Sequence, residues 1–159
     1  MSGRAPGGAR AVADLATGVI HAEVDIAVPP ERVFAALTTP EVAQWWGSEE
    51  TYRVQRWSMD LRVGGRWRGE GTAADGRAFA VEGEVLELDP PRILAHTWRY
   101  DWDEGGETVV RYEITPTVTG ARVTVRHTGF APNSPACSGH ATGWERVLGW
   151  LVSHLERGR

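Results

Sequence analysis

Hydrophobic and polar residues alternate over residues 19–28, which indicates a β-strand early in the chain. Apolar side chains occupy every second position from Ile20 onward, and His21, Glu23 and Asp25 lie between them. A period of two is typical of a strand that buries one of its faces. We therefore expect this segment to be packed on one side and exposed to solvent on the other.

Two short helices are expected after this strand. Pro29-Pro30 ends the strand, and apolar residues follow at helical spacing over residues 33–37, as is typical of a helix that begins with proline. Thr39 is a candidate N-cap for a second short helix that runs through Trp45 and Trp46. The pattern therefore predicts a helical hairpin after the first strand.

A long β-rich region follows, because six segments of strand-like pattern are separated by turn residues. The expected strands are residues 52–59, 66–73, 78–88, 93–101, 107–115 and 121–128. The breaks between them contain Gly-Gly, Asp-Gly and Pro-Pro pairs, and such residues favour tight turns. Short turns between consecutive strands predict an antiparallel meander.

The hydrophobic period changes again near the C-terminus, where a long helix is predicted. Ser134 followed by Pro135 is typical of an N-cap and a first helical residue. Apolar residues then recur at spacings of three, four and seven as far as Leu155, which indicates an amphipathic helix of about 20 residues. The simplest fold is α+β, with the helix covering the concave face of a curved antiparallel sheet.

Residues 1–17 show weak periodicity and lack the apolar stretch of a secretory signal. We expect them to form a flexible N-terminal tail, with an Arg-rich presequence as the alternative. A chain of 159 residues favours one domain, which we place over residues 18–159.

Composition and charge exclude several functional classes. The chain has 17 basic and 21 acidic residues, a net charge of −4, and every basic residue is arginine. This charge disfavours general nucleic-acid binding, which needs a concentrated basic surface. The one cysteine cannot form an intrachain disulfide, and no apolar run approaches the roughly 18 residues that cross a bilayer. We expect a cytoplasmic monomer or homodimer with no nucleic-acid partner and no membrane insertion.

Alternation along the strands assigns an inward face that is aliphatic and aromatic, with a few polar groups. An apolar wall with a few hydrogen-bonding groups suits a small-molecule cavity, and the same residues also suit a packed core whose polar atoms are satisfied internally. The eight tryptophans favour an aromatic wall. The candidate ligand-binding residues are Phe34, Trp45, Trp46, Trp57, Trp67, Phe79, Val81, Val85, Trp98, Tyr100, Tyr112, His127, His140, Trp144, Leu148 and Leu151.

The sequence gives little support for a metal site, a nucleophilic cysteine or a phosphate-binding loop. Cys137 and His140 are a single pair of possible metal ligands, whereas a metal site needs three or four, so we expect no metal and no cofactor. A nucleophilic Cys137 would need a base and an orienting group, and only His140 lies one turn away. Gly69 and Gly71 do not form a phosphate loop, because a strand rather than a helix follows Gly76.

Several segments together resemble a known family. They are PPERVF at 29–34, WWG at 45–47, DLRVGGRW at 60–67, DG at 75–76, GEVLELDPP at 83–91, TW at 97–98, HTGF at 127–130, and His140 with GW at 143–144 and Leu148. In this order they resemble homologues of the activator of the ninety-kilodalton heat-shock protein ATPase. That family lies within the START-like superfamily (also called SRPBCC), which includes the birch pollen allergen and aromatic polyketide cyclases.

The resemblance runs from about Val19 to the last helix and implies a helix-grip fold. In that fold a curved sheet of seven antiparallel strands wraps around a long C-terminal helix, and a hydrophobic cavity lies between the sheet and the helix. Two short helices follow the first strand. The superfamily binds lipids, sterols, flavonoids and polyketides, and only some branches catalyse reactions. Fold analogy therefore leaves the function open.

Three functions remain as hypotheses. The first, which we favour, is a non-catalytic protein that binds a small hydrophobic or aromatic molecule. The second is an enzyme of the cyclase or hydratase type, in which His96, His127, His140, Tyr100 or Tyr112 would act as general acid or base. The third is a co-chaperone-like interaction module that contacts a chaperone in the stress response. It ranks last because the outward-facing strand residues are mainly charged.

Overall fold

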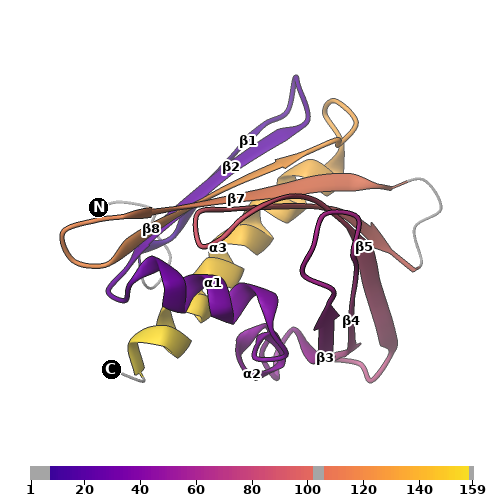
Figure 1. Ribbon diagram of the computed structural model, residues 1–159. Coiled ribbons are helices and arrows are strands. Elements are labelled where there is room, and N and C mark those ends of the chain that lie inside the picture. Colours follow the sequence, from indigo (N-terminus) through magenta and orange to yellow (C-terminus); the bar gives the residue numbers. More distant parts are fainter. Residues whose placement is uncertain (1–7, 102–105, 158–159) are drawn as a thin grey trace.

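The computed structural model describes residues 8–101 and 106–157, and one antiparallel sheet dominates it (Figure 1). The strands lie in the order β1-β2-β8-β7-β6-β5-β4-β3. Their bounds are β1 Arg10–Asp14, β2 Val19–Ile26, β3 Tyr52–Met59, β4 Arg66–Ala73, β5 Ala78–Asp89, β6 Ile93–Tyr100, β7 Thr108–Pro116 and β8 Ala121–Thr128. The helices are α1 Pro30–Thr38, α2 Val42–Trp45 and α3 Pro135–Arg157.

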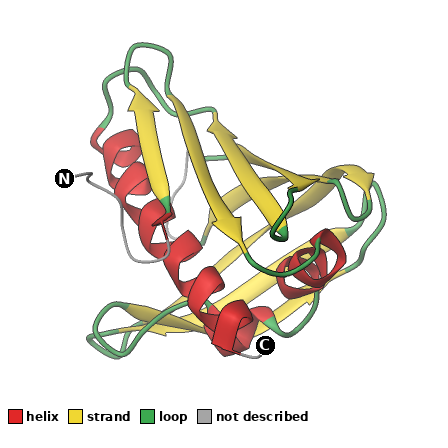
Figure 2. Ribbon diagram, turned by 90° about the vertical axis from the view of Figure 1, so that its left-hand side faces the viewer, coloured by secondary structure: helices red, strands yellow, loops and turns green. Residues whose placement is uncertain are grey.

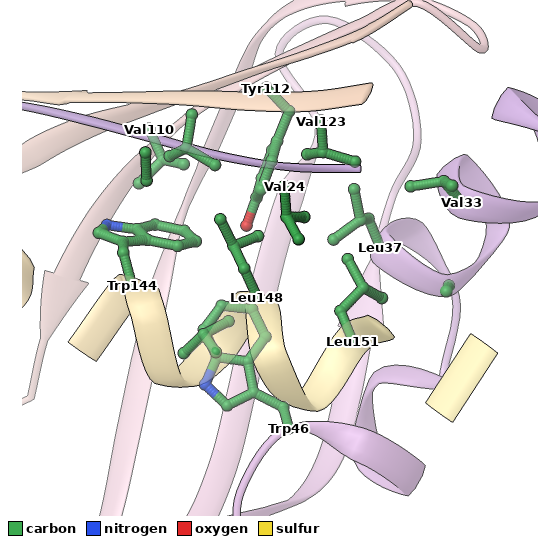
Figure 3. Packing of buried hydrophobic residues seen from close by; sticks show 14 of the residues in the cluster. Val24, Val33, Leu37, Trp46, Val110, Tyr112, Val123, Trp144, Leu148 and Leu151 are labelled. Carbon is green, nitrogen blue, oxygen red and sulfur yellow. The ribbon is translucent and has the colours of Figure 1, made fainter. Parts of the chain in front are cut away.

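The long helix α3 crosses the hollow side of the curved sheet, as Figures 1 and 2 show. Trp144, Leu148 and Leu151 of α3 point toward the sheet, and Trp144 and Leu148 lie next to Val110 and Tyr112 of β7 (Figure 3). All five residues are buried, and burial of such side chains stabilises the fold by roughly 1.5–3 kcal/mol each. The predicted helix-grip fold is therefore confirmed.

The observed strands agree closely with the predicted meander. The N-terminus of α3 is also capped as predicted. Pro135 is the first residue of α3, and the Ser134 hydroxyl accepts a hydrogen bond from the Cys137 backbone N–H at 3.3 Å. Such a cap satisfies one of the donors that a helix start leaves open. Pro30 likewise begins α1, as the sequence predicts.

The prediction for the N-terminal segment needs correction. Residues 10–14, expected within a flexible tail, form strand β1, which pairs with β2 in the register Arg10↔Glu23 to Asp14↔Val19. The described sheet therefore has eight strands rather than seven. The Ala11 N–H also donates to a Glu145 carboxylate oxygen of α3 at 3.2 Å. β1 thus forms a hairpin with β2 and makes one contact with the distant helix α3.

The outer face of the sheet carries paired charges. Arg68 donates to Glu70 at 2.9 Å and to Glu82 at 2.7 Å, and Arg122 lies 2.8 Å from Asp25. Exposed pairs of this kind contribute at most about 1 kcal/mol each. Their main effect is to place charge opposite charge across neighbouring strands. In the described ranges, no helix is long and apolar enough to cross a membrane.

Candidate functional site

A cavity of about 810 Å³ lies between the curled strands β3–β6 and the first half of α3. Its volume falls within the range of roughly 300–1,000 Å³ that is typical of small-molecule sites. Its wall consists of Trp46, Thr51, Tyr52, Val54, Trp57, Ala73, Arg77, Ala78, Phe79, Val81, Trp98, Tyr100, Asp101, Ala136, Gly139, His140, Gly143 and Arg146.

The inner part of this wall is apolar and largely aromatic. Trp46 stacks on Trp57 and Trp98, with ring centroids 5.9 and 5.7 Å apart, and Val54 and Val81 are buried beside them. Offset aromatic pairs at this distance are favourable beyond their buried area. The result is a preformed aromatic wall of which only a small part of each ring is exposed.

Two glycines of β4 leave room for these rings. A Cβ at Gly69 would lie 2.8 Å from the Trp57 ring, and one at Gly71 would lie 2.6 Å from the Phe79 ring and 2.0 Å from the Arg53 carbonyl oxygen. Side chains at these positions would therefore displace the wall. Gly69 and Gly71, which do not form a phosphate loop, therefore leave the space that the rings of the cavity wall occupy.

Three of the five α3 residues on the cavity wall are small. Ala136, Gly139 and Gly143 line the cavity from α3, and a Cβ at either glycine would have no neighbour within 4 Å. The absence of side chains on this strip leaves space between the helix and the curled strands. The cavity therefore depends on these glycines as well as on the curvature of the sheet.

Tyr100 and His140 form a hydrogen-bonded pair on the wall. His140 Nδ1 lies 2.8 Å from the Ala136 carbonyl oxygen, which can only accept, so Nδ1 carries the ring proton. In the neutral ring Nε2 is then an acceptor, and the Tyr100 hydroxyl donates to it at 2.9 Å. The cavity thus contains a phenol whose proton is directed to an imidazole.

Tyr52 contributes a second phenol. Its oxygen accepts a hydrogen bond from Trp46 Nε1 at 3.1 Å. Burial raises the pKa of the Tyr52 phenol, while the hydrogen bond from Trp46 and the charge of Arg146 act in the opposite direction. The phenol is therefore neutral near pH 7 and retains a proton to donate.

Two indole donors beside the cavity have no acceptor. Trp57 Nε1 and Trp98 Nε1 are buried and make no hydrogen bond within the described part of the chain. Most buried donors in proteins are satisfied, and an unsatisfied one costs roughly 1–3 kcal/mol. Both belong to rings of the cavity wall, which distinguishes this region from an ordinary packed core.

The predicted ligand-binding residues divide into two groups. The structure places on the cavity wall Trp46, Trp57, Phe79, Val81, Trp98, Tyr100 and His140. It places away from the cavity, in the core, Phe34, Trp45, Trp67, Val85, Tyr112, His127, Trp144, Leu148 and Leu151. The second group faces inward as predicted but is covered by α1, α3 or neighbouring rings.

Two of the three candidate catalytic histidines are core residues. Trp144 Nε1 donates to His127 Nδ1 at 3.0 Å, and His127 Nε2 donates to the Thr108 hydroxyl at 2.7 Å. Burial lowers the pKa of His127 to about 3 and that of His96 to about 4. Both rings are therefore neutral and away from the cavity wall. Of the three candidates, His140 alone lies on the cavity wall.

Several wall residues were missed by the sequence analysis. They are Thr51, Tyr52, Val54, Ala73, Arg77, Ala78, Asp101, Ala136, Gly139, Gly143 and Arg146. In β3 the pairing with β4 shifts between Val54 and Arg56, so strict alternation does not place Tyr52 and Trp57 on the same side. In α3 the useful signal was the spacing of Gly139 and Gly143, which puts two small residues on one helical face.

The remaining candidate groups do not form a second site. Cys137 is buried, and the described residues contain no group of three or more His, Cys, Asp or Glu placed to hold a metal ion. A hollow of about 550 Å³ on the outer face of β1, β2, β7 and β8 is lined by paired charges such as Arg10 and Glu23. The apolar cavity is therefore the candidate functional site.

Comparison with known proteins agrees with the fold. The family model described as Activator of Hsp90 ATPase homolog 1-like protein matches residues 27–156. A solved structure from Rhodobacter sphaeroides is 26% identical, with 94% of this chain and 98% of that chain covered and a TM-score of 0.80. The AHSA1 protein from Silicibacter pomeroyi is 28% identical, with 89% and 99% covered and a TM-score of 0.76.

A third structure extends the likeness at the level of fold. The AHSA1-like protein from Aeromonas hydrophila is 22% identical, with 88% of this chain and 93% of that chain covered and a TM-score of 0.71. No curated protein matches the chain. Because the family model spans all but the first strands and the chain ends, the chain belongs to the family of Activator of Hsp90 ATPase homolog 1-like proteins.

Proposed function

We propose that the protein binds a small hydrophobic or aromatic molecule in the cavity between β3–β6 and α3. The observation that carries this proposal is the stacked surface of Trp46, Trp57 and Trp98, which lines a cavity of about 810 Å³. An apolar occupant would remove from water the part of the apolar wall that is still exposed, at roughly 25 cal/mol per Å². The space is kept open by Gly139 and Gly143 rather than filled by side chains.

A variant that blocks the cavity without straining the fold tests this proposal. Gly143→Leu places a side chain in open space on the wall, and leucine favours a helix more than glycine does. The matched control is Ser153→Leu, which adds leucine at an exposed position of the same helix. The probe is the neutral dye N-phenyl-1-naphthylamine, whose emission rises in apolar surroundings.

We expect saturable dye emission and tryptophan quenching with the wild type and with Ser153→Leu. Gly143→Leu should weaken dye affinity by about tenfold or more, which corresponds to about 1.4 kcal/mol. Equal binding by Gly143→Leu, or no saturable binding by the wild type to this dye or to a panel of lipids and aromatic metabolites, would contradict the proposal.

The Tyr100–His140 pair favours acid–base catalysis as a second candidate function. In such a step the Tyr100 oxygen would take a proton from carbon next to a ligand carbonyl, while the Tyr100 proton passes to His140 Nε2. The products of this transfer are an enolate and an imidazolium, so charge and protons balance. The distance of 2.9 Å between Tyr100 Oη and His140 Nε2 permits the relay.

Deuterium exchange tests this second candidate. The methyl group of 2-acetylnaphthalene would exchange with D₂O faster in the presence of the wild type, as followed by NMR. Tyr100→Phe should remove the acceleration while N-phenyl-1-naphthylamine still binds. A wild-type rate no faster than that of Tyr100→Phe would reject catalysis and leave the binding proposal intact.

A further inference from the structure

We propose that the bound molecule is an aromatic acid, whose anionic group is held by Arg146 and the Tyr52 hydroxyl. This inference rests on the proposed binding function and specifies the class of ligand. It follows from the distribution of polarity over the cavity wall, from the pairing of the arginines and from the position of Tyr52.

The cavity is apolar inside and charged at its rim. Trp46, Trp57 and Trp98 are buried, whereas Arg77, Asp101 and Arg146 on the same wall are exposed to solvent. A ligand that matches this wall has an apolar body and a polar end. The aromatic faces inside favour a ring system for the body.

The charges at the rim favour an anionic end. Two arginines and one aspartate lie on the wall, although the whole chain carries a net charge of −4. Arg77 is 3.9 Å from Asp75, so a carboxylate already balances it. Arg146 is therefore the wall arginine that no carboxylate of the described residues approaches within ion-pair distance.

Within the described residues, Arg146 shares the lack of a carboxylate partner with Arg53, Arg99 and Arg126 of the sheet, but of these four it alone lies on the cavity wall. Arg68, Arg111 and Arg122 each pair with a carboxylate of the outer face, whereas no ion pair joins Arg146 to any residue of the described ranges. Asp101, the carboxylate of the wall, makes no ion pair with it either. A guanidinium presents a planar fork of donors that matches a carboxylate or sulfonate, so Arg146 is available to an anion.

The Tyr52 hydroxyl is the second group that would donate a hydrogen bond to the anionic group of the ligand. Its hydroxyl oxygen accepts from Trp46, which leaves its own proton for a ligand, and the charge of Arg146 acts on this phenol. Phe79 and Trp150 hold the ring edge-to-face, with centroids 5.7 and 5.8 Å away. Arg146 and a positioned phenol therefore lie at the point where the apolar wall meets solvent.

Two dyes with the same aromatic body test this assignment. N-phenyl-1-naphthylamine is neutral, and 1-anilinonaphthalene-8-sulfonate adds one sulfonate. Arg146→Gln removes the proposed anchor. Arg99→Gln is the matched control, because Arg99 is exposed and neighbours Tyr100 on β6 but alternates to the outer face.

We expect the wild type and Arg99→Gln to bind the sulfonate dye more tightly than the neutral dye. Arg146→Gln should weaken sulfonate binding by about tenfold or more, as expected for a charged hydrogen bond, and should leave neutral-dye affinity within about twofold. Retained neutral-dye binding also shows that the variant is folded. Displacement of the sulfonate dye should require less 2-naphthoate than decanoate.

The outcomes separate the two proposals. If the neutral dye binds but Arg146→Gln leaves sulfonate binding unchanged, or affects it no more than Arg99→Gln does, the anionic assignment is wrong and the binding function stands. If decanoate displaces the dye as well as 2-naphthoate, the aromatic part is wrong. If neither dye binds the wild type, the binding function itself fails.

Discussion

Three histidines of one inward-facing set have different surroundings in the folded protein. His127 is hydrogen-bonded on both ring nitrogens, to Trp144 and Thr108, and His96 is buried next to Trp67. His140 meets Tyr100 on the cavity wall. Alternation predicts which face such a residue occupies, but the partner is set by residues tens of positions away. The identity of the inward residues was therefore predictable, and their division into core and site was not.

The buried histidines predict a loss of stability in mild acid. Their pKa values are about 3 for His127 and about 4 for His96, against an ordinary value of 6.5, with burial as the main cause. Below 6.5 the unfolded chain binds two protons that the folded chain does not. Stability should therefore fall as the pH drops from 6.5 toward 4, by about 1.4 kcal/mol per pH unit for each histidine.

Urea unfolding between pH 7 and pH 5 measures this slope. His127→Phe should be less stable at pH 7, because Trp144 and Thr108 lose their partner, and should show a shallower pH dependence by about one proton. His21→Phe, on the exposed side of β2, should keep the wild-type slope. An equal slope in His127→Phe and wild type would show that His127 takes no part in the acid response.

At the scale of elements, local pattern predicts strands and helices well when their turns are short. Gly76, with φ of 88°, lies in the predicted hairpin between β4 and β5. The pattern fails where pairing is irregular or distant. The bulge in β3 lies after Val54, and β1 is held by β2 and by Glu145 of α3. The β3 bulge interrupts alternation, and β1 pairs with β2 in a hairpin whose first strand has only weak alternation.

Gly83 of β5 lies in close contact with the Trp67 ring and the backbone of Thr97. A Cβ there would lie 2.1 Å from the Thr97 carbonyl oxygen and 2.5 Å from Trp67 Nε1. Trp67 donates to that same oxygen at 2.9 Å. Gly83→Ala should therefore displace Trp67 and lower the free energy of unfolding by about 1–3 kcal/mol, as overpacked cores do.

Gly139→Ala is the control for this substitution. Nothing lies within 4 Å of its Cβ position, and alanine in a helix interior is favoured over glycine by about 0.5–1 kcal/mol. Denaturant unfolding should show opposite signs for the two variants. A Gly83→Ala protein as stable as the wild type would mean that Trp67 can move without loss.

At the scale of the whole molecule, the order of elements was sufficient to predict a curved antiparallel sheet covered by the last helix, because the apolar faces of sheet and helix must cover each other. The helix-grip fold itself was what the family resemblance implied. The volume between them was not predictable. It depends on how far β3–β6 curl away from α3, which is set by the packing of Trp46, Trp57 and Trp98. Sequence pattern therefore indicated an aromatic interior without showing which part of it is open.

The two edges of the sheet also belong to this scale. The β3 edge is partly covered by the segment after α2, where the Val54 N–H donates to the Trp46 carbonyl oxygen at 2.9 Å. The other edge is β1, against α3. Removal of residues 1–14 should expose β2 as a new edge. Such edges favour association between chains.

We expect this truncation to lower the melting temperature, by about 2–4 °C for each kcal/mol lost, and to increase aggregation on heating. Binding of N-phenyl-1-naphthylamine should change by less than about twofold, because the cavity is lined by β3–β6 and α3. Calorimetry and dye titration measure the two effects. A truncated protein with unchanged melting but lost binding would show that β1 serves the cavity rather than the sheet.

The tryptophan rings also have a photophysical consequence. Trp46 lies 5.2–6.1 Å from Trp45, Trp57, Trp98 and Trp144, and Trp67 lies 4.8 Å from Trp57. Rings this close pass excitation energy to one another before they emit. A molecule in the cavity that contacts only the wall rings should then also quench the emission of tryptophans that it does not contact. We therefore expect one molecule bound in the cavity to quench more of the tryptophan emission than its direct contacts alone would account for.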